Sequence, residues 1–419
     1  MKRIIGFDSW TRGSHHFARL VQAFRKRGFE LLLIHIGSWG HDKDRAEEEI
    51  LGDLLVRDIR YYRGMSFKDI LLRENPAAVI YLSTRAFAHQ SFNRYAHSLG
   101  IPTCHLYHGL VNVQAVEAGD LAYKMNWVSQ SRIIFDRFLK NATILLPSYA
   151  KSLVCTKAGL KHWLWFFKEI MHKATATVYD QAPPDCTTTT GCVYTQADVR
   201  HMVRVYGVPQ EMVQVVGNPD LAAFQLKENH LGCRINEQQV RKNEIIYIDT
   251  ALIEAGVVFG GRDDFMKHLL DTHERLREHG YSLILKLHPG HFRTGVADDA
   301  RKHGLEICEK EDFVDRLNKA SAVIVESSTA AMIPALMGMP LLLANYGKLQ
   351  GQAYGKVLTT YPKARHLKDL KQVQNILSEI ETSTQAQEVW DWIRENSGPL
   401  PAEDMPDRVA EAVMQVIRN

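Results

Sequence analysis

Two short motifs in the second half of the chain carry side chains that could bind a phosphate. The segment 286–290 reads Lys-Leu-His-Pro-Gly, and the segment 326–329 reads Glu-Ser-Ser-Thr. Each follows a short apolar run, 283–285 or 322–325, as expected where a buried parallel strand meets a loop. Open parallel sheets bind their ligands at that edge. The lysine, the imidazole and the hydroxyls at a helix start therefore predict a site for a nucleoside monophosphate- or diphosphate-linked sugar.

His288 and Lys286 supply the charge of the first motif. Because Pro289 follows it, His288 is held in an extended conformation at the strand end. Its imidazole could bind a phosphate or the carboxylate of an acidic sugar, and Lys286 or Arg293 would add positive charge. The alternative is a structural histidine in a turn. The hydroxyl motif that follows downstream favours the binding site.

The second motif places three hydroxyl side chains, Ser327, Ser328 and Thr329, at the start of a helix. Helix capping is the commonest use of these residues, but one cap requires only one hydroxyl. Gly338 and Pro340 close the helix onto the next strand. We therefore expect the hydroxyls to bind a phosphate.

Two acidic residues, Asp249 and Glu254, follow the apolar run 245–248. If this run is the first strand of the second sheet, its carboxyl end opens toward the ligand. A carboxylate there could act as the general base for an acceptor hydroxyl, or as the nucleophile of a double displacement. The alternative for Asp249 is a turn or helix cap made through neighbouring N–H groups.

In the first half of the chain, His108 and Gly109 end the strand expected over 103–107. A histidine can accept a proton near neutral pH, and a glycine permits close backbone approach. The alternative is a turn glycine beside a structural histidine. The position at a strand's carboxyl end favours a role on the acceptor side of a reaction.

Strand and helix patterns alternate along both halves of the chain, which predicts an α/β protein with two doubly wound parallel sheets facing across a cleft. A length of 419 residues fits two domains of about 200 residues each. We place an N-terminal domain at 1–190 and a C-terminal domain at 191–397. Residues 398–419 are expected to form a linker and an amphipathic helix that packs back across the domains.

The composition is that of a soluble globular protein, with 45% hydrophobic and 24% charged residues. A net charge of +3 indicates no broad surface for nucleic acid. Six cysteines without a CxxC pair fit reduced thiols in a cytosolic protein. The N-terminus starts directly with a strand pattern, which indicates neither a signal peptide nor a membrane anchor. We therefore expect a cytoplasmic protein.

A basic and aromatic segment, residues 157–173, lies within the helical stretch expected over about 148–175. Such a surface suits the headgroup region of a membrane, where a lipid-linked acceptor would reside. Alternatively, its aromatic side is an interdomain or core face and its lysines are the wet side. Peripheral contact with the inner face of a membrane therefore stays open.

Four signals occur in a characteristic order: His108-Gly109, Gly217-Asn218-Pro219, His288-Pro289, and the hydroxyls 327–329 with their helix and Gly338-Met339-Pro340. In this set, spanning about residues 100 to 345, the chain resembles GT-B glycosyltransferases of bacterial capsule and lipopolysaccharide synthesis. It is similar to the transferases that use CMP-linked Kdo or sialic acid, and to the CDP-polyol transferases of teichoic-acid type. Each signal alone is weak, and the set carries the resemblance.

The resemblance implies that the C-terminal domain binds the donor nucleotide and that the N-terminal domain holds the acceptor, a glycan or lipid-linked glycan. It implies transfer without a metal ion and with no cofactor besides the nucleotide-sugar substrate. A CDP-glycerol or CDP-ribitol phosphotransferase is the close alternative. A UDP-N-acetylglucosamine epimerase and a non-catalytic nucleotide-sugar binding protein share the architecture.

The resemblance also adds candidate residues. Glu326 precedes the hydroxyls where many GT-B enzymes place an acidic contact to a ribose hydroxyl, although a solvent-facing glutamate fits equally. Gly13, Ser14 and His15 lie between the first strand and the first helix, where GT-B enzymes often have a glycine loop near the reaction centre. Ser14 and His15 could also be no more than a helix cap.

Overall fold

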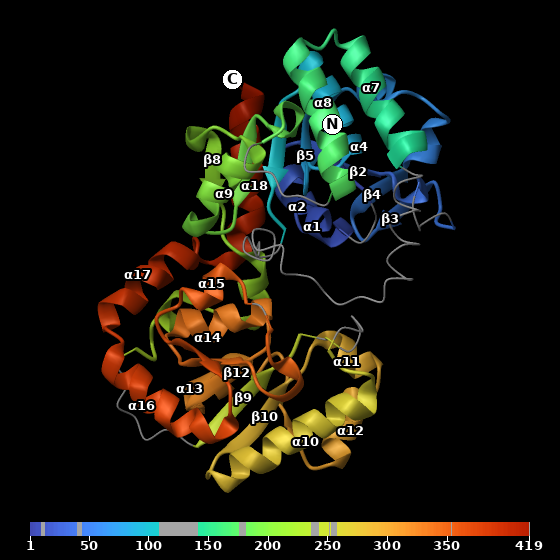
Figure 1. The fold of residues 1–419 in the computed structure, drawn as a ribbon. Helices are drawn as coiled ribbons and strands as arrows, with labels where there is room; N and C mark the ends of the chain where they lie inside the picture. The colour runs from blue at the N-terminus through green and yellow to red at the C-terminus, as the bar shows by residue number, and fades with distance from the viewer. Residues whose placement is uncertain are drawn as a thin grey trace. The chain divides into compact units, whose positions relative to one another are not determined.

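The apolar runs of the sequence form the strands of two separate sheets, each in its own α/β unit (Figure 1). The computed structural model describes residues 1–9, 13–39, 44–108, 141–175, 182–235, 243–250, 252, 258–352 and 354–418. Within these residues, the first unit comprises 1–108, 141–217 and 403–418, and the second comprises 218–402. The chain therefore leaves the first unit once and returns to it at its end.

The sheet of the first unit is parallel except at one edge. Its strands are β1 (Lys2–Asp8), β2 (Phe29–His35), β3 (Glu48–Leu51), β4 (Leu54–Asp58), β5 (Pro76–Tyr81), β6 (Thr103–Leu106), β7 (Thr190–Val193) and β8 (Val213–Val215). They lie in the order β3-β4-β2-β1-β5-β6-β7-β8, with only the β3–β4 pair antiparallel. Central strands are buried on both faces, which explains why β1 and β5 read as nearly continuous apolar runs.

Helices cover the sheet of the first unit. They are α1 (Ser14–Ala18), α2 (Val21–Arg25), α3 (Phe67–Glu74), α4 (Phe87–Ser98), α7 (Leu146–Cys155), α8 (Leu160–Thr175), α9 (Gln196–Tyr206) and α18 (Met405–Arg418). Helix α9 begins with a capping box made by Thr195 and Asp198 and ends at Gly207, whose positive φ closes the helix. The run 144–146, which the sequence indicated as a strand, lies instead in a π-helical turn and the start of α7.

The first sheet extends further along the chain than its sequence indicated. We expected the strand near Cys192 to open the second sheet and placed the boundary at residue 190. Instead, β7 pairs with β6, β8 pairs with β7, and the first unit continues to Gly217. Each buried parallel strand reads as the same short apolar run, so the sequence pattern cannot indicate which sheet a strand joins.

The C-terminal helix α18 packs on α2 and on strands β5, β6 and β7 of the first unit. Its buried face carries Val409, Val413 and Val416, and Arg27 forms an ion pair of 2.6 Å with Asp407. Arg408 Nε also donates to the carbonyl oxygen of Val216, at 2.7 Å. We expected this helix to pack across both domains, and its described contacts of this kind lie in the first unit.

The sheet of the second unit is parallel throughout, in the order β11-β10-β9-β12-β13-β14. Its strands are β9 (Glu244–Ile248), β10 (Ser282–Lys286), β11 (Glu306–Ile307), β12 (Ala322–Val325), β13 (Leu341–Ala344) and β14 (Ala364–Leu367). Its helices are α10 (Arg262–Glu278), α11 (Pro289–Arg293), α12 (Val296–Lys302), α13 (Phe313–Lys319), α14 (Met332–Met337), α15 (Lys356–Thr359), α16 (Val373–Ser383) and α17 (Ala386–Asn396). Alternate residues of β9 enter two different cores, one on each face of this sheet.

The three central strands of the second sheet end at the same level. Ile248 of β9 pairs with Lys286 of β10 on one side and with Val325 of β12 on the other. The residues that follow these ends, Asp249 and Glu326 among them, therefore share one edge of the sheet. The sequence predicted these three strand ends, and the register confirms them.

No helix within the described part of the chain is long and apolar enough to cross a membrane.

Candidate functional site

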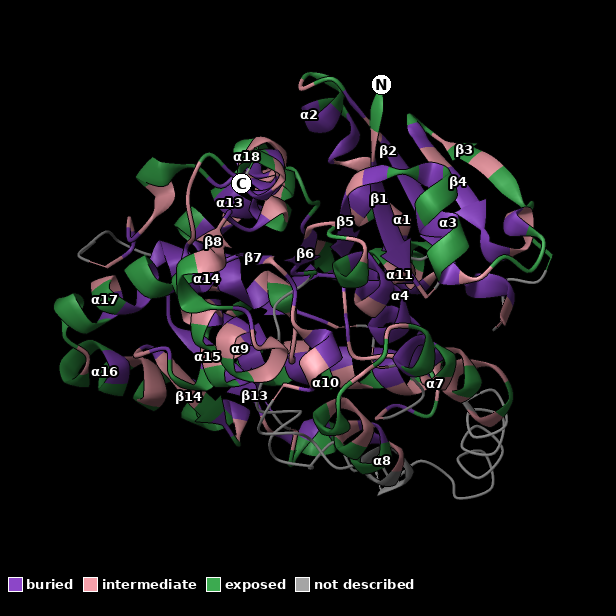
Figure 2. Cartoon of the chain, turned by 90° about the horizontal axis from the view of Figure 1, so that it is seen from above, coloured by how far each residue is buried: buried purple, intermediate pink, exposed green. Residues whose placement is uncertain are grey.

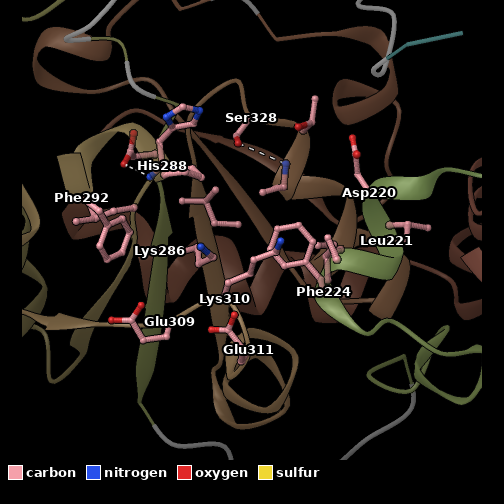
Figure 3. Close-up of a pocket in the computed structure, with 18 of the residues that line it drawn as sticks. Asp220, Leu221, Phe224, Lys286, His288, Phe292, Glu309, Lys310, Glu311 and Ser328 are labelled. Carbon is pink, nitrogen blue, oxygen red and sulfur yellow. Dashed lines mark hydrogen bonds between the residues drawn. The ribbon is translucent and has the colours of Figure 1, made fainter. Parts of the chain in front are cut away.

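A cavity of about 570 Å³ lies in the second unit, at the carboxyl edge of β9, β10 and β12 (Figure 3). The segment from β8 to β9 closes one side of it with the 3₁₀ helix η7 (Pro219–Phe224). The cavity is lined by Asn218, Asp220, Leu221, Ala223, Phe224, Ile248, Asp249, Lys286, Leu287, His288, Pro289, Phe292, Glu309, Lys310, Glu311, Ser328, Thr329, Ala330 and Ile333. Both sequence motifs therefore contribute to one concave site.

Lys286, the last residue of β10, carries its ammonium group into this cavity although only 7% of the residue is exposed. The Nζ atom lies 5.9 Å from the ring centroid of Phe224 and 5.7 Å from that of Phe313. Within the described residues, no carboxylate forms an ion pair with it and no acceptor forms a hydrogen bond. Burial lowers the pKa of Lys286, because the charged form loses hydration. An anion in the cavity would supply the missing partner.

His288 caps the short helix α11 through its own side chain. Its Nδ1 atom accepts a hydrogen bond of 3.2 Å from the N–H of Gly290. Because Nδ1 accepts, the proton of a neutral ring resides on Nε2. His288 therefore presents an Nε2–H donor in the lining of the cavity.

Asp249, the first residue after β9, is almost completely buried, with 2% of its surface exposed. Its Oδ2 atom accepts from the backbone N–H of His288 at 2.7 Å and lies 2.9 Å from Nδ1 of His291. The carboxylate thus ties the end of β9 to the loop after β10. This placement makes Asp249 a positioning residue for His288, in place of the solvent-accessible base or nucleophile that the sequence indicated.

Glu326 lies deeper still, with none of its surface exposed, and it does not line the cavity. Its carboxylate accepts hydrogen bonds of 2.7 Å from Tyr247 Oη and 2.9 Å from the N–H of Thr250. Neither of the two expectations for Glu326, a ribose contact or a solvent-facing glutamate, matches this burial. The side chain instead joins the ends of β9 and β12.

Burial and the neighbouring Asp249 charge raise the pKa of Glu326 from 4.5 to about 7. A folded-state pKa above the unfolded one means that the folded protein holds the proton more tightly, so this group's contribution to stability is lost as pH rises from about 4.5 to about 7. The change amounts to at most about 3 kcal/mol.

We therefore expect Glu326→Gln to stabilise the protein at about pH 8 and to change it little at about pH 5. The amide can accept from Thr250 N–H and donate to Tyr247 Oη, while Tyr247 can donate to His268 Nε2, 3.2 Å away. Thermal unfolding at both pH values measures the effect. Equal destabilisation at both pH values would show that Glu326 is bound as a permanent carboxylate.

The hydroxyl motif is only partly in the cavity. Ser328 and Thr329 line it, whereas Ser327 does not. Ser328 Oγ accepts from the N–H of Ala330 at 3.4 Å, which is a cap on the short 3₁₀ turn before α14. Because α14 has only six residues, we assign the anion-binding capacity of this edge to side chains, and not to a helix dipole.

Phe224 and Lys310 belong to the site, and the sequence analysis did not identify them. Lys310 Nζ lies 5.5 Å from the centroid of the Phe224 ring, so this ring stands near two ammonium groups. The segment 217–219 was expected only to turn the chain into a linker. Asn218 does cap η7 by accepting from the N–H of Asp220, and both residues also line the cavity.

The charges of the cavity are segregated. In Figure 3, His288 and Ser328 lie along its upper rim, the carboxylates of Glu309 and Glu311 lie along the lower one, and Lys286 lies between them. Carboxylates repel a phosphate, so an anion is expected on the side of His288 and Ser328.

The first-unit candidates lie at the carboxyl edge of the first sheet. His108 is exposed, and its ring centroid is 5.7 Å from that of His16. Burial, together with the charges of His15, Arg19 and His108, lowers the pKa of His16 to about 3, so the His16 ring is neutral at physiological pH.

Gly13 is required by space, because a Cβ atom there would overlap Oδ2 of Asp8 and crowd Leu82. Ser14 and His15 begin α1 without a side-chain cap from Gly13. Two predicted residues, Gly109 and Glu254, lie outside the described residues.

Among the residues that the structure describes, no group of three or more His, Cys, Asp or Glu side chains is arranged to hold a metal ion. All six cysteines carry free thiols, as their spacing predicted.

Solved structures with the same two-sheet architecture include CalG4, the calicheamicin glycosyltransferase, which aligns over 100% of this chain and 99% of that chain at 11% identity and a TM-score of 0.53. A UDP-GlcNAc 2-epimerase from Methanocaldococcus jannaschii, solved in complex with UDP-GlcNAc and UDP, aligns over 99% and 100% at 12% identity and a TM-score of 0.42. No protein-family model matches the sequence, and no curated protein matches it. The likeness to CalG4 shows a GT-B fold and nothing finer, because the identity is so low.

Proposed function

We propose that this protein is a glycosyltransferase that moves a sugar from a nucleotide-activated donor to a glycan, and that the donor phosphate binds in the cavity of the second unit. The observation that carries the proposal is Lys286, a buried ammonium group in a concave site without a counter-charge among the described residues. The GT-B fold raises the expectation of a nucleotide-linked ligand by analogy only.

The proposed donor is a CMP-linked acidic sugar of the Kdo or sialic acid type. The ordered motifs of the sequence support it, and so does the number of cations that line the cavity. Lys286, Lys310 and His288 could together serve one phosphate and one sugar carboxylate. CDP-glycerol and CDP-ribitol are the alternative donors, since they carry the same nucleoside.

In the proposed reaction, the bond between the anomeric carbon and the phosphate oxygen breaks, and an acceptor hydroxyl forms the new bond to that carbon. The departing nucleotide gains negative charge, which Lys286 and the Nε2–H of His288 would stabilise. A general base must take the acceptor proton. We assign that role to His108, with Gly13, Ser14, His15 and Gly109 on the acceptor side, because Asp249 is engaged in structural hydrogen bonds.

Release of free nucleotide from CMP-Kdo, CMP-sialic acid, CDP-glycerol and UDP-GlcNAc, with and without a glycan acceptor, tests the proposal. We expect CMP release from a CMP-linked sugar, continuing in EDTA, and a loss of at least about tenfold in His288→Ala. His303→Ala, at the exposed end of α12, is the matched control. Nucleotide binding without release from any donor would indicate a non-catalytic binding protein, and neither binding nor release would refute the proposal.

A further inference from the structure

Helix α8 exposes a stripe of large apolar side chains. Leu160, Leu164 and Phe167 are 74%, 62% and 59% exposed, and their spacing of four and three residues puts them on one face. Val154, at the end of the neighbouring α7, is 65% exposed. Figure 1 shows α7 and α8 side by side, and Figure 2 shows exposed residues on both.

The exposed stripe is not needed to hold α8 on the first unit, because a different face does this. Phe166 is buried, and its ring centroid lies 5.6 Å from that of Tyr149 and 6.4 Å from that of Phe87. Trp163 and Ile170 pack on the same cluster, at helical spacing from Phe166. The helix is therefore apolar on two faces, of which the core uses one.

The charges beside the exposed stripe have one sign. Four exposed lysines lie in this pair of helices and their connection: Lys151, Lys157, Lys161 and Lys168. Glu169 is the single acidic residue in 142–170, and it is only 1% exposed. Lys168 Nζ lies 4.4 Å from the ring centroid of Trp165, so its stem runs along an aromatic surface.

We propose that this face of α7 and α8 binds the surface of an anionic lipid bilayer. Leu160, Leu164 and Phe167 would enter the boundary between headgroups and acyl chains, and the lysines would contact the anionic headgroups. The positive charge selects this occupant, because an apolar stripe flanked by unopposed lysines would place like charges together in a symmetric pair with a second copy. The inference goes beyond the proposed function and does not depend on it.

Cosedimentation of the full chain with vesicles tests this surface. We expect binding to vesicles that contain phosphatidylglycerol, weaker binding to pure phosphatidylcholine vesicles, and loss of binding at high salt. The double variant Leu164→Glu, Phe167→Glu should bind at least about tenfold more weakly. Leu72→Glu, a leucine 56% exposed on α3, is the matched control and should bind as the wild type does.

Charge and insertion are separated by the variant Lys161→Glu, Lys168→Glu, which should lose the preference for phosphatidylglycerol. All of these side chains except those of Trp165 and its neighbours on the core face are exposed, so thermal unfolding should be unchanged. Equal vesicle binding by the wild type and the Leu164/Phe167 variant would overturn the proposal. A wild-type dimer that the same variant abolishes, without vesicle binding, would overturn it in favour of a second copy of the chain.

Discussion

Lys286→Met is expected to weaken the binding of CMP by about 10- to 100-fold while leaving the free protein at least as stable as the wild type. A hydrogen bond to a charged group contributes about 1.5–3 kcal/mol, which sets the expected loss. The methionine keeps most of the apolar stem that packs between Phe224 and Phe313 and removes a buried charge. Titration calorimetry measures the affinity, and thermal unfolding measures the stability.

The pH dependence of stability offers a second view of Lys286. Its folded-state pKa is lowered below the unfolded value of 10.5, so the unfolded chain binds this proton more tightly. The stability of the wild type should therefore gain from deprotonation of Lys286 as pH rises toward 10.5, and Lys286→Met should lack that gain. Lys371→Met, on the exposed turn before α16, is the matched control for both measurements. A Lys286→Met protein that unfolds, or that binds CMP normally, would be inconsistent with an anion-binding lysine.

Asp249→Ala should lower the free energy of unfolding by about 3–5 kcal/mol, because it removes one member of a buried, hydrogen-bonded pair. The substitution deprives the N–H of His288 of its acceptor and the ring of His291 of its carboxylate partner. Since the chain has two units that can unfold separately, hydrogen exchange should localise the loss to 243–250 and 282–293.

Asp249→Asn separates positioning from catalysis. The amide oxygen can still accept from the N–H of His288, so we expect most of the stability and part of the nucleotide affinity to remain. An Asp249→Asn protein with wild-type hydrogen exchange, wild-type affinity for CMP and no transfer would instead indicate a base or nucleophile, as the sequence alone predicted.

The strand ends of the second sheet could be predicted from the sequence because buried parallel strands are short apolar runs that stop abruptly. Ile248, Lys286 and Val325 mark three such stops, and the register brings them to one edge. His288 and Ser328 followed from that edge. The pattern did not distinguish polar side chains that face the cavity from those that tie the strands together, so the burial of Asp249 and Glu326 appeared only in the structure.

Long-range contacts account for the rest. Phe224 reaches the cavity from a 3₁₀ helix more than sixty residues before Lys286, and no local pattern records that approach. The same holds for β7 and β8, whose pairing with β6 depends on non-local hydrogen bonds. For α8, the sequence showed an aromatic and basic helix, and only the packing of Phe166 reveals which of its apolar faces is free.

A crystal structure of the protein with CMP tests the central claim most directly. We predict that the phosphate lies in the cavity of the second unit, with its oxygens about 2.7–3.2 Å from Lys286 Nζ and from His288 Nε2. A phosphate bound elsewhere, with Lys286 still without an anionic partner, would contradict the account.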